Sequence, residues 1–306
     1  MDELNQLRNQ AKNRLIACIV TVIAAMILSI IIVQSRSSFF TPVVFVFPFF
    51  FVVIGIIVSV LVMRKPRQRY RDAYKQALVR RSLESVFTNL EYEPELGISY
   101  ETIASTKMMN MGDRFHSEDY ISAMYRNIRF EQSDVHIEEE HTTTDSDGHT
   151  STSYVTIFRG RWMIFDFNKE FRANLQIAQK GFPNARRKRF FGKKETRFKQ
   201  VEMESDSFNK GFYVFAQNEH DAFYIVTPAF MERIENLAAH NRGKLLFCFV
   251  GDRLHIAIHD NKDSFEPGSL FKSIDETAAM EKIRGEILTI TQFIDELNLD
   301  NTLFKY

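Results

Sequence analysis

Two long runs without a charged residue constrain this chain most. Leu15 to Val33 is an uncharged run of 19 residues, and Val43 to Met63 is a second run of 21 residues. A helix rises about 1.5 Å per residue, so each run reaches roughly 30 Å, the thickness of the hydrocarbon core of a bilayer. Only nine residues separate the two runs. The sequence therefore predicts a transmembrane helical hairpin over residues 15–63, after a cytoplasmic N-terminus over residues 1–14.

The charges beside the two runs predict the orientation of this hairpin. A secretory signal peptide is the main alternative for the first run, but the run is long for such a peptide and lacks a small-residue cleavage site. The connector carries only Arg36, with Phe39 and Phe40 at interface depth. Basic residues flank the other ends, at Arg8, Lys12, Arg14, Arg64, Lys65, Arg67, Arg69 and Arg71. The positive-inside rule therefore places both termini and the main domain in the cytoplasm.

The basic residues are concentrated in two blocks on an otherwise acidic protein. Residues 64–81 hold eight Lys or Arg and one acid, and residues 186–199 hold the same numbers. The rest of the chain has 23 basic and 37 acidic residues, although the whole chain has a formal net charge of zero. Such segregation indicates that an anionic surface lies near the basic blocks.

The remainder of the chain predicts an α+β fold. Residues 64–118 read as a basic juxtamembrane helical linker, with a helix from Gln68 to about Asn89, and residues 119–306 as a cytoplasmic α+β domain. Apolar alternation predicts strands over 119–141, 151–168, 173–178, 197–204 and 211–216, and a hairpin over 244–260 that turns at Gly251-Asp252. Helices are expected after the N-cap Thr227 and from Asp275 to Leu297. We expect a mostly antiparallel sheet with two or three packed helices; whether the sheet is open or closed as a barrel is left undecided.

A cluster of potential metal ligands lies in the first predicted hairpin. Its members are His136, Glu138, Glu139, Glu140, His141, Asp145, Asp147 and His149. Asp147-Gly148 predicts a two-residue turn that pairs His141 with Tyr154. Neighbouring residues of a strand point to opposite faces, so these side chains do not converge. A charged hairpin that projects into solvent is therefore favoured, and no metal and no cofactor is expected.

Other candidate catalytic residues give no recognisable site. His255 and His259 share a strand face but lie about 13 Å apart, too far to share an ion. Cys18 and Cys248 are interpreted as small buried hydrophobic residues. The chain lacks the motifs of nucleotide-binding, metallohydrolase and serine-hydrolase sites, so the catalytic residues are unknown and catalysis is not favoured.

The second basic block is the predicted surface for a membrane or a partner. Its residues are Arg186, Arg187, Lys188, Arg189, Phe190, Phe191, Lys193 and Lys194. Lys and Arg near an anionic leaflet contribute about 1 kcal/mol each, and the two Phe side chains can enter the interface. A solvated loop is an equally simple interpretation, while nucleic acid or an acidic protein would also fit. The predicted spans favour the membrane, because they hold the block near lipid.

Several segments resemble a known family. The motif "FNKGFYV" (Phe208 to Val214) is followed by "TPAFMERI" (Thr227 to Ile234) and preceded by "TIFRGRWMIFDFNKEF" (Thr156 to Phe171). In these segments the chain resembles the bacterial domain-of-unknown-function family 3137. The resemblance covers about residues 120–260 and the two apolar runs. It implies a multi-pass protein of the bacterial inner membrane with a cytoplasmic domain, and it brings no catalytic residues.

Two functional hypotheses follow. The first is a membrane-anchored, non-catalytic module that binds a protein partner, the anionic membrane surface or both, either as a monomer or as an oligomer. The alternative is a membrane-associated, hydrolase-like enzyme with a site assembled from the acidic sheet. A binding role for nucleic acid is disfavoured.

Overall fold

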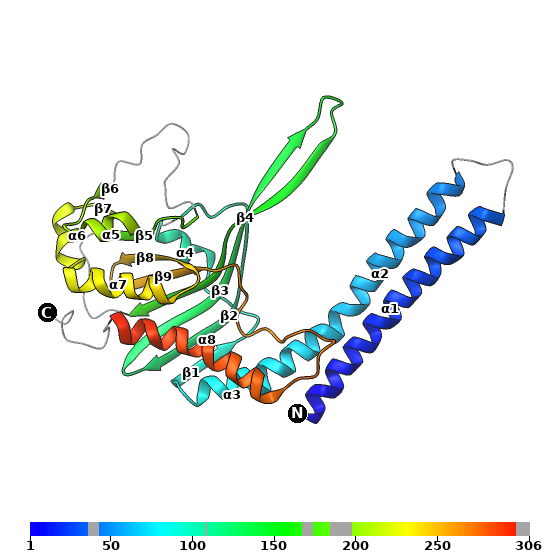
Figure 1. The fold of residues 1–306 in the computed structure, drawn as a ribbon, viewed down its shortest axis with the longest axis horizontal. Helices are drawn as coiled ribbons and strands as arrows, with labels where there is room; N and C mark the ends of the chain where they lie inside the picture. Colours follow the sequence, from blue (N-terminus) through cyan, green and yellow to red (C-terminus); the bar gives the residue numbers. More distant parts are fainter. Residues whose placement is uncertain (36–42, 108, 167–173, 184–197, 298–306) are drawn as a thin grey trace. The chain divides into compact units, whose positions relative to one another are not determined.

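The chain forms two compact units in the computed structural model (Figure 1). The model describes residues 1–35, 43–107, 109–166, 174–183 and 198–297, with side chains except at 32–35 and 43–51. Of the two compact units, one comprises Met1–Arg81 and Glu266–Lys282, and we call it the helical unit. The second, the sheet unit, comprises Ser82–Phe265 and Ile283–Tyr306.

Two long helices make up most of the helical unit. Helix α1 (Asp2–Ser35) and helix α2 (Val43–Tyr74) lie side by side. A Cβ atom added to Gly55 of α2 would lie 3.3 Å from Val22 Cγ2 of α1, so the glycine allows close approach of the two helices. Helix α2 continues into a π-helical turn, η1 (Lys75–Arg80), and then α3 (Arg81–Glu84). The helix predicted from Gln68 is therefore the end of α2 and ends earlier than expected.

The segment Glu266–Lys282 returns to the helical unit through specific polar contacts. Lys75 is fully buried, and its Nζ lies 2.8 Å from Glu266 Oε1. Arg8 Nη1 donates a hydrogen bond of 2.6 Å to the carbonyl oxygen of Lys272. A buried ammonium group needs such a partner, because removal from water penalises an unpaired charge by several kcal/mol.

The sheet unit contains an open antiparallel sheet of nine strands within the described residues. Their spatial order is β1-β2-β3-β4-β9-β8-β5-β7-β6, and every pair is antiparallel. The strands are β1 (Thr88–Glu93), β2 (Arg114–Tyr125), β3 (Ile128–Thr144), β4 (Thr150–Asp166), β5 (Leu175–Gln179), β6 (Lys199–Val201), β7 (Phe212–Ala216), β8 (Lys244–Val250) and β9 (Arg253–His259). The predicted α+β class with a mostly antiparallel sheet is confirmed.

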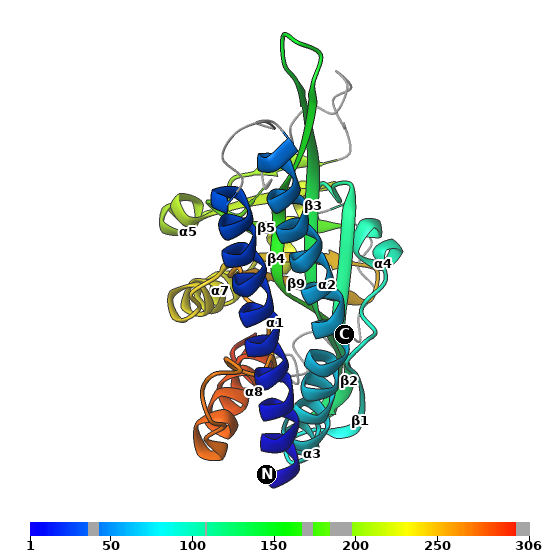
Figure 2. The ribbon, with the colours of Figure 1, turned by 90° about the vertical axis from the view of Figure 1, so that its right-hand side faces the viewer.

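Helices cover both faces of this sheet (Figure 2). Helices α7 (Pro228–His240) and α8 (Glu276–Leu297) pack on one face, where Phe230 and Phe293 contact Phe249 and Phe247 of β8. Helix α4 (Tyr100–Ser105) lies over the other face, and the adjoining Thr106 carbonyl accepts from Gln176 of β5. Two short helices, α5 (Asp206–Gly211) and α6 (Glu219–Ile225), flank β7. The core is therefore filled on both sides of the sheet.

Several local predictions are confirmed. Thr227 caps α7, because its hydroxyl accepts from the amide of Phe230, and Pro228 is the first helical residue. Asp275 caps α8 in the same way, through Thr277 and Ala278. The β8–β9 hairpin turns at Gly251, whose φ is +60°. Short-range turn and capping chemistry thus determines these element boundaries.

The first predicted strand run is divided in the structure. Arg126 and Asn127 both have positive φ, 49° and 64°, and form a two-residue turn between β2 and β3. Paired positive φ values are typical of the tight hairpin turn that matches strand twist. Strand β1 and helix α4, each of six residues, were not predicted.

The pairing of β3 with β4 differs by one residue from the prediction at its outer end. Tyr154 lies opposite Glu140, not opposite His141, because the turn closes between Asp145 and His149. The register shifts between Ile137 and Glu138, and Ile137 pairs with Phe158. We call Glu138–Thr156 the arm, and Ile128–Ile137 with Phe158–Asp166 the trunk. Tyr154 was expected in the core, but it is 36% exposed on the arm, which projects beyond the sheet in Figure 1.

Candidate functional site

The predicted basic surface lies outside the described residues. All eight of its members, from Arg186 to Lys194, fall within residues 184–197. Phe39 and Phe40 of the predicted connector also lie outside the described part. The contact of this block with lipid or protein therefore stays a prediction.

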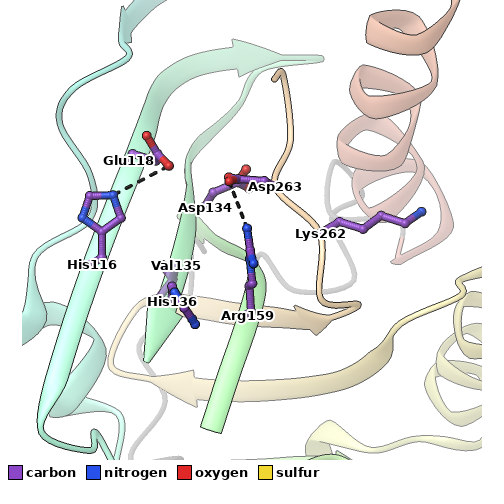
Figure 3. A pocket seen from close by; sticks show the side chains of 8 residues that line it. All are labelled: His116, Glu118, Asp134, Val135, His136, Arg159, Lys262 and Asp263. Atoms are coloured by element: carbon purple, nitrogen blue, oxygen red, sulfur yellow. Dashed lines mark hydrogen bonds and ion pairs between the residues drawn. The ribbon is translucent and has the colours of Figure 1, made fainter. Parts of the chain in front are cut away.

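The sheet unit contains a small polar pocket of about 40 Å³ (Figure 3). It lies where β2, β3 and β4 approach the segment that follows β9. Its lining residues are His116, Glu118, Asp134, Val135, His136, Arg159, Lys262 and Asp263. Seven of these eight side chains are polar or charged, so the pocket gathers titratable groups from four segments of the chain.

Strand register brings the carboxylates of this pocket together. Glu118 of β2 lies opposite Asp134 of β3, next to a bulge in β2 between Glu118 and Ile121. In Figure 3 the carboxyl groups of Asp134 and Asp263 lie close together, and Lys262 points away from them. Arg159 Nη2 lies 3.2 Å from Asp263 Oδ2. One guanidinium group therefore pairs with one of the three carboxylates.

Asp134 is the most perturbed acid of the pocket. It is 5% exposed, the amide of Ser264 donates to its Oδ2, and its Oδ1 has no partner among the described residues. Burial raises the pKa of Asp134 well above its usual value, although the nearby Arg161 guanidinium opposes the shift. The carboxylates of Asp119 and Asp263 raise this pKa further. Low dielectric and like charge both favour the protonated form here.

The chemistry that this pocket supports is limited by its size and geometry. In the described chain, Glu118, Asp134 and Asp263 do not bring one oxygen each to within 4.8 Å of the others. A volume of about 40 Å³ holds few water molecules, whereas pockets for small-molecule ligands are typically several hundred Å³. The arrangement suits ordered water and a shared proton better than a bound substrate.

His255 and His259 contact aromatic residues of the core, Trp162 and Phe182 respectively. Trp162 Nε1 donates to His255 Nδ1 at 3.2 Å, and burial lowers the pKa of His255 to about 4, assisted by the Arg253 charge. Burial also lowers the pKa of His259, whose Nδ1 accepts from the Arg159 amide. Both imidazoles therefore act as neutral hydrogen-bond acceptors. Cys248 is buried as predicted, whereas Cys18 on α1 is only partly buried.

The suspected metal ligands of the first hairpin lie along the arm, except His136 at the end of the trunk, and they do not converge. His136 lies 3.8 Å from Glu138, and His141 lies 3.7 Å from Glu139, as separate pairs. Asp145 instead accepts from the amides of Asp147 and His149 and shapes the turn. No three of these eight ligands gather within 4.8 Å in the described residues. The interpretation as a charged, projecting hairpin agrees with these positions.

The N-terminal helix offers a large apolar surface. The segment Asp2–Ile31 is long and apolar enough to cross a membrane, and none of its most apolar stretch is buried. An N-terminal signal sequence would share these properties. Aliphatic side chains along α1, such as Val20, Leu28 and Ile30, are more than half exposed. By length and composition, α1 is therefore a candidate membrane span.

Reasoning from the sequence missed the polar pocket. Its residues come from four segments, and no short motif joins Glu118, Asp134, Arg159 and Asp263. One weak signal existed, namely the charged residues Asp134 and Arg161 within the two strand patterns, both of which the structure buries. The register of β3 and β4 places these two residues opposite each other.

The fold and surfaces define an α+β protein with an antiparallel sheet and an apolar N-terminal helix. A family model described as "Protein of unknown function (DUF3137)" matches residues 156–299. Residues 156–299 match this family, which confirms the resemblance carried by the segments from Thr156 to Ile234.

Two further comparisons add little. The crystal structure of the mycobacterial trehalose monomycolate transport factor A aligns with 75% of this chain and 97% of its own, at 9% identity and a TM-score of 0.36. That TM-score is too low to relate the two folds. No curated protein matches the chain.

Proposed function

We propose that this protein is a membrane-anchored, non-catalytic interaction module of the bacterial inner membrane. In this proposal α1 and α2 cross the membrane as a hairpin, and the sheet unit lies in the cytoplasm. The sheet unit then binds a protein partner, the anionic leaflet or both.

The observation that carries the proposal is the exposed aliphatic surface of the paired helices. On α1 the exposed side chains include Ile19, Val20, Ile23, Ile27, Leu28, Ile30 and Ile31, and on α2 they include Val53, Ile54, Ile56, Ile57, Val58, Val60, Leu61 and Val62. Exposed apolar patches beyond a few hundred Å² are rare on soluble monomers and mark sites of membrane or protein contact. Serine hydroxyls within the helices, at Ser29 and Ser59, donate back to helix carbonyls, which satisfies them in an apolar medium.

The flanking charges support the orientation. Lys12 and Arg14 precede the apolar part of α1, and Arg64, Lys65 and Arg67 follow that of α2. Positive charge gathers on the cytoplasmic side of membrane helices. The chain continues from α2 into the sheet unit, so the same rule supports a cytoplasmic sheet unit.

The structure of the sheet unit favours a role in binding a partner over a role in catalysis. Its core is filled on both faces, and the described pocket is too small for most organic substrates. The described residues offer no observation that favours the alternative of a hydrolase-like enzyme. Binding therefore involves the outer surface of the sheet unit, the basic block or both.

Cysteine labelling in intact bacterial cells tests the topology. With Cys18 and Cys248 replaced by Ala, Ser37→Cys in the connector should react with a membrane-impermeant maleimide, and Asn9→Cys should react only after lysis. Epitope tags at both ends should remain on one polypeptide, because no signal peptide is removed. Loss of the N-terminal tag, or labelling of Asn9→Cys in intact cells, would contradict the proposal.

A fluorescent probe tests the leaflet contact. The full chain, with Gly192→Cys carrying an environment-sensitive dye, is placed in nanodiscs of neutral or anionic lipid. A blue shift in anionic lipid is expected, and Gln substitutions at Arg186, Arg187, Lys188 and Arg189 should abolish it. Equal emission in both lipids would remove the leaflet from the proposal and leave the protein partner.

A further inference from the structure

The arm presents an unpaired strand edge. On its inner side β4 pairs with β3 along the whole arm, but β9 pairs with β4 only from Gly160 to Asp166. From Thr150 to Phe158 the outer edge of β4 pairs with no strand in the described residues. The outer edge of β3 is partly covered, because Asp113 binds the Glu138 carbonyl and the Glu140 amide. The free edge is therefore that of β4.

Strand β9 ends at the base of the arm, where its last pair is His259 with Gly160. Gly160 has φ +149°, and an added Cβ atom would lie 2.0 Å from the Ile258 carbonyl oxygen. One residue earlier, Arg159 accepts from the Asn261 amide and donates its own amide to His259. The chain after β9 thus satisfies Arg159 and then leaves the sheet. The next outward-facing backbone groups of β4 stay available.

The arm has a strong negative charge. It carries five acids, Glu138, Glu139, Glu140, Asp145 and Asp147, and no Lys or Arg from Glu138 to Phe158. One cation lies at its base, where Arg114 stacks 3.3 Å above the ring of Tyr154. Soluble proteins commonly protect exposed edges with Lys or Pro, and Thr150–Phe158 contains neither.

A single β4 residue separates each of the three glutamates of the arm from the free edge. Glu138, Glu139 and Glu140 lie opposite Thr156, Val155 and Tyr154 of β4. Neighbouring strands are about 4.8 Å apart, so a long basic side chain on an added strand reaches across β4 to a carboxylate on β3.

We propose that the outer edge of β4, from Thr150 to Thr156, binds an extended basic segment of a partner protein as an added β-strand. Backbone hydrogen bonds supply the attachment, and Lys or Arg side chains reach Glu138, Glu139 and Glu140. This inference rests on the proposed function, for which it names the binding surface and the class of partner. A second copy of the same arm is the wrong occupant, because two five-acid arms would repel each other.

A defined peptide tests this assignment. The full chain is placed in nanodiscs of neutral lipid, and binding is followed by the fluorescence anisotropy of a nine-residue peptide of alternating Lys and Val. One matched peptide has Glu for Lys, and another carries N-methyl groups on alternate backbone amides. Only the unmodified basic peptide should bind well; the methylated one should bind at least roughly tenfold more weakly, since it cannot complete the ladder.

Variants of the chain separate the arm from other acidic surfaces. Glu138→Gln with Glu139→Gln and Glu140→Gln should weaken binding about tenfold. The matched control neutralises three exposed acids of the sheet unit, Glu202→Gln, Glu204→Gln and Glu232→Gln, and should bind as the native chain does. A second variant replaces residues 140–154 by an Asn-Gly turn and should lose binding, while its Trp162 fluorescence shows that the trunk remains folded.

Three results would overturn the inference. They are equal binding of the methylated peptide, retained binding by the shortened arm, and a dimer that depends on the arm in analytical ultracentrifugation. The proposed function fails separately, if alkaline carbonate extracts the native chain from membranes. If the chain stays in the membrane but binds the basic peptide equally well with and without the arm, this inference alone is overturned.

Discussion

The trunk and the arm belong to the same two strands but have opposite environments. Trunk residues such as Val135, Phe158 and Trp162 are at most 2% exposed, whereas Val155 of the arm is 50% exposed. The trunk is covered on both faces by helices, whereas in the described residues the arm is held by its own ladder and, at its base, by Asp113 and Arg114. A register shift between Ile137 and Glu138 separates the two parts. Burial therefore stabilises one half of this hairpin, and the other half is free to bind.

The trunk and strand β9, which pairs with it, bury polar groups, whereas none of the five acids of the arm is buried. Asp134 and His255 are both less than 6% exposed, and burial shifts each pKa toward the neutral form. Glutamates of the arm form loose pairs with histidines near 3.7–3.8 Å. Burial favours the neutral form of Asp134 in the trunk, whereas the glutamates of the arm are accessible to water. This difference agrees with a trunk that acts as a scaffold and an arm that acts as a binding surface.

The largest contrast is expected from aromatic truncation. Trp162→Ala removes a fully buried ring that contacts Phe158 and His255, and should destabilise the sheet unit by about 3–5 kcal/mol. Tyr154→Ala on the arm should destabilise the sheet unit far less, because its Glu140 hydrogen bond and its Arg114 contact are open to water. Urea unfolding of the full chain in detergent, followed by circular dichroism, compares the two. A similar loss of unfolding free energy in the two variants would show that the arm is part of the core.

The second contrast concerns pH. The folded pKa of His255 is about 4, below the ordinary value of 6.5, so the unfolded state binds more protons between these values. His255 therefore contributes stability that is fully present above pH 6.5 and lost as pH falls toward 4. The loss between pH 7.5 and pH 5 is about 2 kcal/mol.

The variant His255→Asn isolates this effect. It keeps an acceptor for Trp162 but cannot titrate, so the difference in unfolding free energy between native and variant chains should shrink as pH falls. The opposing contribution of Asp134 cancels in this difference. The single tryptophan, Trp162, reports the transition directly. A difference independent of pH would contradict the burial assigned to His255.

The smallest contrast uses the same substitution in both parts. Val135→Ala in the trunk removes two buried methyl groups and should cost about 1.5 kcal/mol. Val155→Ala in the arm should change the unfolding free energy by less than about 0.5 kcal/mol. Trp162 fluorescence during urea unfolding measures both. Equal effects would mean that the arm packs against another surface in solution.

The sequence predicted those parts of the fold that local chemistry determines. Thr227 followed by Pro228 marks a helix start, and Gly251-Asp252 marks a turn, because backbone geometry there depends on one or two residues. The register of the arm was wrong by one residue, since a bulge at its base compensates for a longer turn. No local pattern distinguishes that arrangement from a regular hairpin.

The pocket could not be predicted for a different reason. Asp134 meets Asp263 and Ser264 only because β9 and the segment after it lie over β3, more than 120 residues later in the chain. A single sequence gives the strand pattern of each segment but not their spatial order. The unpaired edge of β4 could not be predicted from the sequence for the same reason, because it depends on where β9 ends.

Alkaline carbonate extraction of membranes tests the central claim most directly. Carbonate at high pH releases proteins held at the membrane surface by charge, and leaves proteins with spanning helices in the pellet. We expect the full chain to remain in the membrane pellet and to be released only by detergent. Recovery of the chain in the carbonate supernatant would contradict the account of α1 and α2 as a membrane anchor.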